Sequence, residues 1–255
     1  MRRRRPACEL ALGLVVASLL SAGSREAQAF VTTFGCAGAS SCTLAELFAG
    51  GSIQANFTRF ENWELEFIDP DGVQPDFALI VVEGKDDGGL DPGDGIKFSG
   101  NSELRVSGAD RLDMAIGFIV TDIGANLEII QDNSLTILSD TVVGGAFLKV
   151  GEFVADGSGV GLGQKEVETD PAFSPPIVSD AIEFPVGQTQ LIIEKDILLQ
   201  SGLAGDSAEL DMFEQRFSLP EPEGPVMLGA CLVVLWALHQ LRSRRSADGR
   251  RNSST

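Results

Sequence analysis

Residues 112–120 read LDMAIGFIV, the longest stretch of the chain in which large apolar residues occupy every second position. These residues are Leu112, Met114, Ile116, Phe118 and Val120, and small Ala115 and Gly117 lie between them. Successive side chains of a β-strand point to opposite faces, so a period of two predicts a strand with one apolar face. Because such a face must be covered by another layer, the stretch predicts a sheet packed on a second sheet.

Runs with the same period lie on both sides of this stretch. Trp63, Leu65 and Phe67 are expected to face one way, with Glu64 and Glu66 facing the other. Further strand signals are a continuous buried run at 77–82, Leu104 with Val106, 147–154, 191–199, and Phe213 with Phe217. Gly, Asp and Pro clusters separate the runs, as antiparallel hairpins require. The pattern predicts an all-β fold, an antiparallel β-sandwich of jelly-roll or Ig-like type.

The N-terminus has the three parts of a secretory signal peptide. Arg2 to Arg5 form a basic region, and an apolar region too short to span a membrane follows at 10–20. Ala27 and Ala29 then make a small-x-small cleavage site, so residues 1–29 are expected to be removed by signal peptidase after passage through the secretory translocon. The mature chain is expected to begin at Phe30.

Two features are expected close to the mature N-terminus. Cys36 and Cys42 are the two cysteines of residues 30–219, and an oxidising compartment would join them in a small disulfide loop. The alternative of a redox pair or metal site lacks both C-x-x-C spacing and histidine. Thr43 and Glu46 form a capping box, which predicts one short helix of two turns ending at Gly50-Gly51.

The C-terminus reads LPEPEGPVMLGACLVVLWALHQLRSRR at 219–245. Pro220-Glu221-Pro222 is expected to be extended, because each proline fixes φ and disfavours helix in the residue before it. Residues 226–238 then carry no charge, and Arg242, Arg244 and Arg245 follow. An apolar span before a basic cluster predicts a single transmembrane helix at about 225–241, with the arginines and the tail 246–255 in the cytoplasm.

The three parts of this C-terminus, in this order, resemble the PEP-CTERM sorting signal of exported proteins of Gram-negative bacteria. The resemblance covers about a tenth of the chain and implies recognition at Pro220, Glu221 and Pro222 by a membrane exosortase. This chain departs from the family pattern in having a tail at 246–255, since such proteins usually end at the arginines. The alternative is an ordinary C-terminal anchor, although a permanent anchor would more often exceed the roughly 24 Å that 226–241 span as a helix.

A second resemblance concerns the start of the exported domain. Residues 43–53 (TLAELFAGGSI), together with a Phe-rich end, are similar to a recurring type of PEP-CTERM ectodomain. This resemblance implies a β-sandwich and assigns no functional residues. The expected division is therefore a signal peptide at 1–29, one exported domain at 30–219, the sorting signal at 220–245 and the tail at 246–255.

The composition of residues 30–219 excludes several classes of function. The domain carries 32 acidic and nine basic residues, a formal charge of −23, which repels nucleic acid. It has no histidine, because the one histidine is His239, so neither a Ser-His nor a Cys-His nucleophile can be built and zinc lacks ligands. A glycosidase with two carboxylates needs only Asp and Glu and stays open, but nothing in the sequence selects a pair. The domain is expected not to be an enzyme.

One loop, DDGGLDPGDG at 86–95, has the ligand chemistry of a calcium site. Asp86, Asp87, Asp91 and Asp94 supply hard oxygen ligands on a Gly-rich backbone. The spacing is not that of an EF-hand and the closing Glu is absent. A solvated acidic turn without metal is the favoured interpretation, and no cofactor is expected.

These observations predict a non-catalytic exported protein with a sorting signal for an exosortase. Its precursor would be held in the inner membrane, and the product would reach the cell surface or the extracellular, biofilm matrix of a Gram-negative bacterium. The alternative is a carbohydrate-binding or carbohydrate-active module delivered by the same signal to extracellular polysaccharide. Exposed aromatics on one sheet face or a carboxylate pair in a cleft would favour it, although Trp63 is the domain's one Trp and Tyr is absent.

Overall fold

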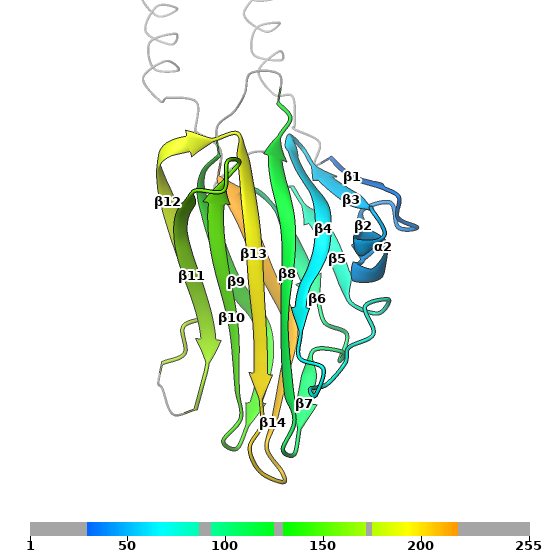
Figure 1. Ribbon diagram of the computed structural model, residues 1–255, viewed down its shortest axis with the longest axis vertical. Coiled ribbons are helices and arrows are strands. Elements are labelled where there is room, and N and C mark those ends of the chain that lie inside the picture. The colour runs from blue at the N-terminus through cyan, green and yellow to red at the C-terminus, as the bar shows by residue number, and fades with distance from the viewer. Residues whose placement is uncertain (1–29, 87–92, 125–129, 172–174, 219–255) are drawn as a thin grey trace, which may run out of the picture.

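The computed structural model describes residues 30–86, 93–124, 130–171 and 175–218. This part of the chain contains fourteen strands and one short helix (Figure 1). In chain order they are β1 (Val31–Phe34), β2 (Ser41–Thr43), α2 (Leu44–Phe48), β3 (Ser52–Ala55), β4 (Thr58–Ile68), β5 (Val81–Lys85), β6 (Asp94–Ser99), β7 (Arg105–Ser107), β8 (Arg111–Asp122), β9 (Ile130–Val143), β10 (Phe147–Asp156), β11 (Gly161–Thr169), β12 (Ser179–Gln188), β13 (Gln190–Gln200) and β14 (Ser207–Ser218).

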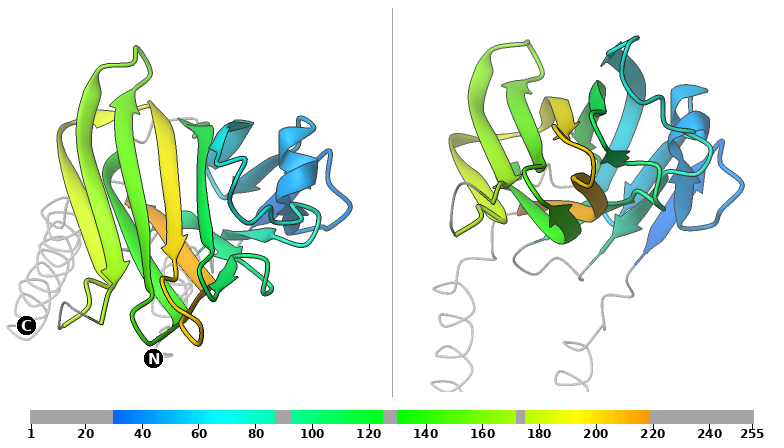
Figure 2. Two further views of the ribbon diagram at one scale, coloured as in Figure 1. Left: turned by 60° about the horizontal axis from the view of Figure 1, so that its bottom comes forward. Right: turned by 90° about the horizontal axis from the view of Figure 1, so that it is seen from below.

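The strands form two antiparallel sheets, which confirms the predicted β-sandwich. Sheet A has the order β1-β3-β4-β8-β13-β10-β11, and sheet B has the order β12-β9-β14-β6-β5-β2 with β7 also paired to β14. With seven strands each among the described residues, the sheets are larger than those of the eight-stranded jelly roll or the immunoglobulin fold. Two further views show α2 at the side of the molecule away from β11 and β12 (Figure 2).

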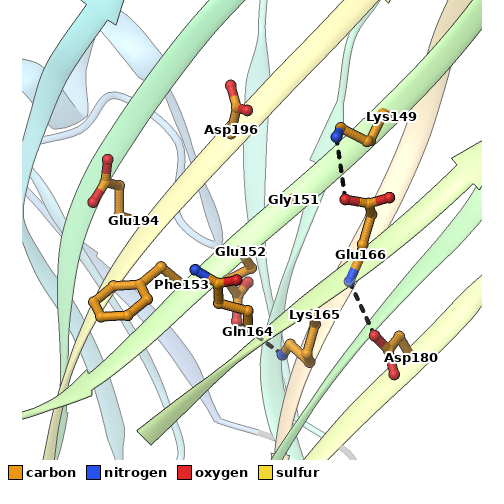
Figure 3. A pocket seen from close by; sticks show the side chains of 10 residues that line it. All are labelled: Lys149, Gly151, Glu152, Phe153, Gln164, Lys165, Glu166, Asp180, Glu194 and Asp196. Atoms are coloured by element: carbon orange, nitrogen blue, oxygen red, sulfur yellow. Dashed lines mark hydrogen bonds and ion pairs between the residues drawn. The ribbon is translucent and has the colours of Figure 1, made fainter. Parts of the chain in front are cut away.

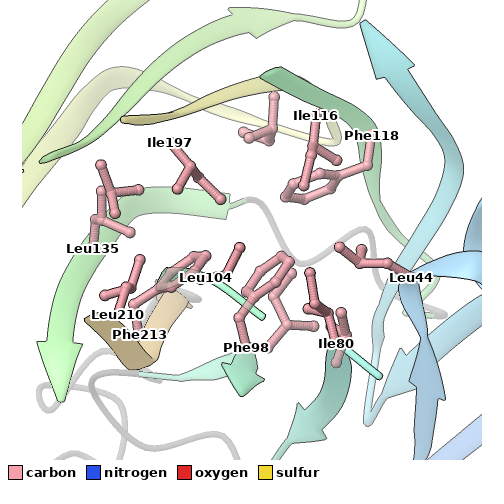
Figure 4. Packing of buried hydrophobic residues seen from close by; sticks show 14 of the residues in the cluster. Leu44, Ile80, Phe98, Leu104, Ile116, Phe118, Leu135, Ile197, Leu210 and Phe213 are labelled. Atoms are coloured by element: carbon pink, nitrogen blue, oxygen red, sulfur yellow. The ribbon is translucent and has the colours of Figure 1, made fainter. Parts of the chain in front are cut away.

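Strand β8 lies at the centre of sheet A, as the alternation of 112–120 predicts. Its five large apolar side chains are all at most 2% exposed and face sheet B. Figure 4 shows Ile116 and Phe118 of β8 opposite Phe98 and Phe213 of sheet B. Trp63 stacks on Phe118 with ring centroids 4.3 Å apart, and Phe98 stacks on Phe213 at 4.4 Å. The predicted buried positions in β7, β10, β13 and β14 are likewise in this core.

Strand β4 departs from the predicted alternation. Asn62 has φ of 57°, and the pairing of β4 with β8 shifts there and again between Leu65 and Phe67. These bulges put Phe60 and Trp63 in the core although they are three residues apart, while Leu65 and Phe67 are 36% and 49% exposed. The prediction of one apolar face for Trp63, Leu65 and Phe67 was therefore wrong beyond Trp63.

The predicted buried run at 77–82 was also wrong in its first half. Strand β5 begins at Val81, and residues 77–79 form a turn in which Leu79 is 49% exposed. The turn has a role in the fold, since the carbonyls of Phe77 and Ile80 accept hydrogen bonds from Ala45 and Leu44. These are the first backbone N–H groups of α2, which need partners outside the helix.

The predicted capping box and disulfide are both confirmed. The Thr43 side chain accepts from Glu46 N, and a Glu46 carboxylate oxygen accepts from Thr43 N at 2.8 Å. The other Glu46 oxygen accepts from Ala37 N at 2.9 Å, and so holds the loop that the Cys36–Cys42 disulfide closes. The helix has five residues, which is shorter than the two turns expected.

The first and last described residues lie at the same end of the sandwich. Phe30 N donates to Asp86 Oδ2 at 2.5 Å, directly after β5, while Phe217 of β14 pairs with Asp94 at the start of β6. Because β5 and β6 pair with Lys85 opposite Gly95, both ends lie beside the end of β5 and the start of β6, at the top of Figure 1.

Candidate functional site

The outer face of sheet A has a hollow of about 610 Å³ over β13, β10 and β11 (Figure 3). The register of these strands creates it. Leu148, Val150 and Val154 of β10 point into the core, so Lys149, Gly151 and Phe153 point outwards. The same alternation turns outwards Glu194 and Asp196 of β13, and Gln164 and Glu166 of β11. Gly151 also lines the hollow, and a Cβ atom added to it would lie 3.7 Å from Cβ of Asp196.

The Phe153 ring forms the apolar part of the hollow. It is 37% exposed, and its outer edge leans over Gly161 of β11, where a Cβ atom added to the glycine would lie 3.1 Å from Cζ of the ring. A side chain at position 161 would crowd the ring, so the Phe153 ring can take this position because residue 161 is a glycine. An aromatic ring surrounded by polar side chains can stack on the apolar face of a ligand while its neighbours make hydrogen bonds.

The polar part of the hollow is mainly acidic. Four carboxylates line its surface, and Lys149 Nζ, 3.1 Å from Glu166 Oε2, is the one ammonium group on the outward side chains that line it. Burial raises the pKa of Asp196, and the negative charge of Asp113 on the neighbouring strand raises it further. The hollow therefore favours cationic or polyhydroxylated ligands over anions.

Asp180 reaches the hollow from the other sheet. Strand β11 is the edge of sheet A, and its Glu166 N donates to Asp180 Oδ2 of β12 at 2.9 Å. Glu168 and Ile177 exchange two backbone hydrogen bonds further along the same edge. The edge of β11 is thus partly capped by the chain leading into β12, which fixes one wall of the hollow and blocks pairing with another chain.

Glu194 and Asp196 are a carboxylate pair in a cleft, the feature that a carbohydrate-binding or carbohydrate-active module predicts. They lie two residues apart on one face of β13, a spacing of about 7 Å along a strand. The rim of several aromatics that the same alternative predicts is not found in the hollow, since Phe153 is its one aromatic residue among the described residues.

The predicted calcium ligands are only partly described, and the two that are have other roles. Asp94 is fully buried in β6, where Oδ2 lies 3.3 Å from Thr58 Oγ1, so its assignment to a solvated turn was wrong. Asp86 accepts from Phe30 N. Asp87 and Asp91 lie outside the described residues. Within the described ranges, no group of three or more His, Cys, Asp or Glu side chains is placed to hold a metal ion.

The residues predicted to act in export and sorting lie outside the described residues. They are Ala27, Ala29, Pro220, Glu221, Pro222, Arg242, Arg244 and Arg245. The one helix among the described residues, α2, is not long and apolar enough to cross a membrane.

The hollow was not predicted from the sequence. Its signal was present in β10, where Lys149, Gly151 and Phe153 occupy the positions between buried residues. Alternation alone could therefore place Phe153 on the outer face. It could not place Asp180 or Glu194 beside it, because β10, β11, β12 and β13 meet through pairings that only the fold defines.

Comparison with known proteins gives a broad likeness. No family model matches the sequence, and no curated protein matches it. A DUF4465 family protein from Bacteroides caccae matches with 11% identity over 74% of this chain and 97% of that chain, at a TM-score of 0.27. The mannan-recognising carbohydrate-binding module TmCBM27 matches with 13% identity over 62% of this chain and 87% of that chain, at 0.26.

Tailspike protein 4 of bacteriophage CBA120, in its enzymatically active domain, matches with 15% identity at a TM-score of 0.23. The match covers 62% of this chain and about a fifth (19%) of the tailspike chain. At these TM-scores, the likenesses carry no conclusion about the family, the site or the function of this chain.

Proposed function

We propose that the chain is a non-catalytic exported protein that an exosortase recognises at Pro220-Glu221-Pro222. The product would reside at the cell surface or in the extracellular matrix, without a cofactor. The sequence of the C-terminus carries this proposal, with the uncharged run 226–238 between the Pro-Glu-Pro motif and the arginines. The motif begins two residues after the last residue of β14, so the enzyme would meet it directly beyond the folded domain.

The position of the two ends supports the proposal. A precursor with a signal peptide before Phe30 and a membrane helix after the motif needs both segments to reach one membrane. Phe30 and Ser218 lie at the same end of the sandwich, beside the end of β5 and the start of β6. The domain can therefore lie on one side of the membrane, and neither segment has to run along the surface of the domain to reach the membrane.

The test compares the full chain with a triple variant, Pro220→Ala, Glu221→Ala and Pro222→Ala, in a host that has an exosortase. The variant should be exported and folded, because the motif is outside the core, but should keep its tail and stay in the membrane fraction. Glu223→Ala, directly beside the motif, is the matched control and should be processed normally. Equal mature sizes for wild type and triple variant would exclude the sorting signal and leave the ordinary anchor.

The hollow on sheet A supports a second function, binding of extracellular polysaccharide. The observation that favours it is the arrangement of Phe153 beside Gln164 and the carboxylates of Glu194 and Asp196. The ring would stack on a sugar, and the polar groups would bind its hydroxyl groups. Because the hollow and the whole exported domain are acidic, the preferred polymer would carry amino groups rather than uronic acids.

The polysaccharide proposal is tested by affinity electrophoresis in gels with chitosan, a neutral glucan or alginate. Chitosan should retard the protein, and this retardation should weaken with Phe153→Ala and with Asp196→Asn. Phe67→Ala is the matched control, since Phe67 is also exposed but lies outside the hollow. Equal retardation of Phe153→Ala and wild type, or retardation by alginate alone, would show that the hollow is not such a site.

A further inference from the structure

The core of the sandwich contains a charged cluster of Lys165, Glu152 and Lys195. These residues form one row across sheet A, because Glu152 of β10 pairs with Lys165 of β11 on one side and with Lys195 of β13 on the other. All three side chains are completely buried. Glu152 Oε1 lies 2.8 Å from Lys165 Nζ, and Glu152 Oε2 contacts Lys195 Nζ.

Two amides of sheet B complete the cluster. Asn133 of β9 donates from Nδ2 to Glu152 Oε1 at 2.6 Å. Gln215 of β14 donates from Nε2 to Glu152 Oε1 at 2.9 Å and to Asn133 Oδ1 at 3.2 Å. Both amides are fully buried. A lysine amine, an asparagine amide and a carboxylate therefore meet in the space between the sheets.

The cluster is not balanced in charge. Two ammonium groups face one carboxylate, and removing an unmatched charge from water is strongly unfavourable in a protein core. Burial lowers the pKa of Lys165 to about 8, against the opposing attraction of Glu152. Burial also lowers the pKa of Lys195. Although burial alone would raise the pKa of Glu152, the charges of Lys195 and Lys165 lower it, so Glu152 is a carboxylate.

We propose that Lys165 and Asn133 react with each other to form an intramolecular isopeptide bond, with Glu152 as the proton carrier. The neutral Nζ of Lys165 attacks Cγ of Asn133, and the new N–C bond forms as Glu152 accepts a proton from Nζ. Glu152 then gives this proton to Nδ2, the Cγ–Nδ2 bond breaks, and ammonia leaves. The products are one secondary amide and one ammonia molecule, and Glu152 is a carboxylate again.

The contacts of Glu152 and Gln215 suit the proton transfers and the charge that develops in this reaction. Lys165 Nζ and Asn133 Nδ2, which give up and receive the proton, both contact the same oxygen of Glu152. The hydrogen bond from Gln215 Nε2 to Asn133 Oδ1 polarises the carbonyl and would stabilise the negative charge that develops on this oxygen. The buried position keeps water from competing with the amine.

The contacts select Lys165 over Lys195 as the nucleophile. Lys195 Nζ contacts the other oxygen of Glu152 and lies 5.5 Å from the centre of the Phe213 ring, which binds an ammonium group. After the reaction, the cluster would contain one ammonium group and one carboxylate, Lys195 and Glu152, and its charges would balance. The bond would also join β11 of sheet A to β9 of sheet B.

Mass spectrometry of tryptic peptides from the full chain tests the proposal. Trypsin does not cut after an acylated lysine, so peptide 112–149, which contains Asn133, should be linked to peptide 150–195, with the loss of one ammonia molecule. Asn133→Ala and Lys165→Arg should each abolish the linked species. Lys149→Arg, a lysine on the outer face of β10, is the matched control and should keep it.

Two further results decide the roles of the residues. Asn133→Asp should still form the bond but lose water instead of ammonia, which a structural role for Asn133 would not produce. Glu152→Gln should leave the peptides unlinked. Wild-type protein in which 112–149 and 150–165 are recovered separately and at full mass would overturn the proposal, and so would a link through Lys195. The wild-type measurement decides the matter even if a variant does not fold.

Discussion

The aromatic stack between the two sheets allows a sharp test of the core. Phe98 is 1% exposed and stacks on Phe213 with an angle of 8° between the rings. It also makes an edge-type contact with Trp63, with ring centroids 6.1 Å apart. It therefore connects an aromatic neighbour within sheet B to one in sheet A. Phe98→Ala should lower the free energy of unfolding by about 4 kcal/mol, from the lost burial and the cavity that remains.

This magnitude is easily measured. For a domain of this size it corresponds to a fall of roughly 8–16 °C in the melting temperature. Urea denaturation followed by circular dichroism should give a lower midpoint with an unchanged slope. Phe67→Ala is the control: its ring is 49% exposed, and its loss should change the stability by no more than about 0.5 kcal/mol. If Phe98→Ala were no more destabilising than Phe67→Ala, the two sheets would not pack through this stack.

Two other predictions concern the N-terminal loop and helix. Replacing Cys36 and Cys42 with Ser should lower the stability by about 2–3 kcal/mol in the chain-entropy estimate for so short a loop, and dithiothreitol should shift the wild-type denaturation midpoint but not that of the variant. Hydrogen bonds from the backbone of Thr43 and of Ala37 lower the pKa of Glu46 below its ordinary value of 4.5. The contribution of Glu46 to stability is therefore complete at neutral pH and is lost as the pH falls through 4.5 and below. The difference in unfolding free energy between wild type and Glu46→Gln should shrink in acid. A constant difference from pH 7 to pH 3 would contradict this.

The fold could be predicted where local chemistry decides the structure. The alternation at 112–120 needs only the strand period, and the capping box of Thr43 and Glu46 needs only residues three apart. The prediction failed in β4, because two bulges, one at Asn62 with its φ of 57° and one between Leu65 and Phe67, each shift the register of β4 against β8. Bulges depend on the partner strand, here β8, and have no sequence signal as clear as the period itself.

The charged cluster shows a different reason for failure. Glu152, Lys165 and Lys195 stand at the inward positions of their strands, where an alternating pattern places apolar residues. A single charged residue in a strand is ordinarily assigned to solvent, because burial of an unpaired charge is so unfavourable. Their burial follows from meeting one another across three strands, and only the register of β11, β10 and β13 brings them together.

Strand β14 would also determine how the domain responds to mechanical force. It ends at Ser218, directly before the predicted sorting signal at 220–245, and lies between β9 and β6. Hydrogen bonds of an antiparallel pair run perpendicular to the strands. A pull on Ser218 along β14, resisted at the opposite end of the sandwich, would therefore shear the β9 and β6 ladders as a whole instead of opening their bonds one after another. Attachment through this strand would make the domain a strong link between a surface and whatever it holds.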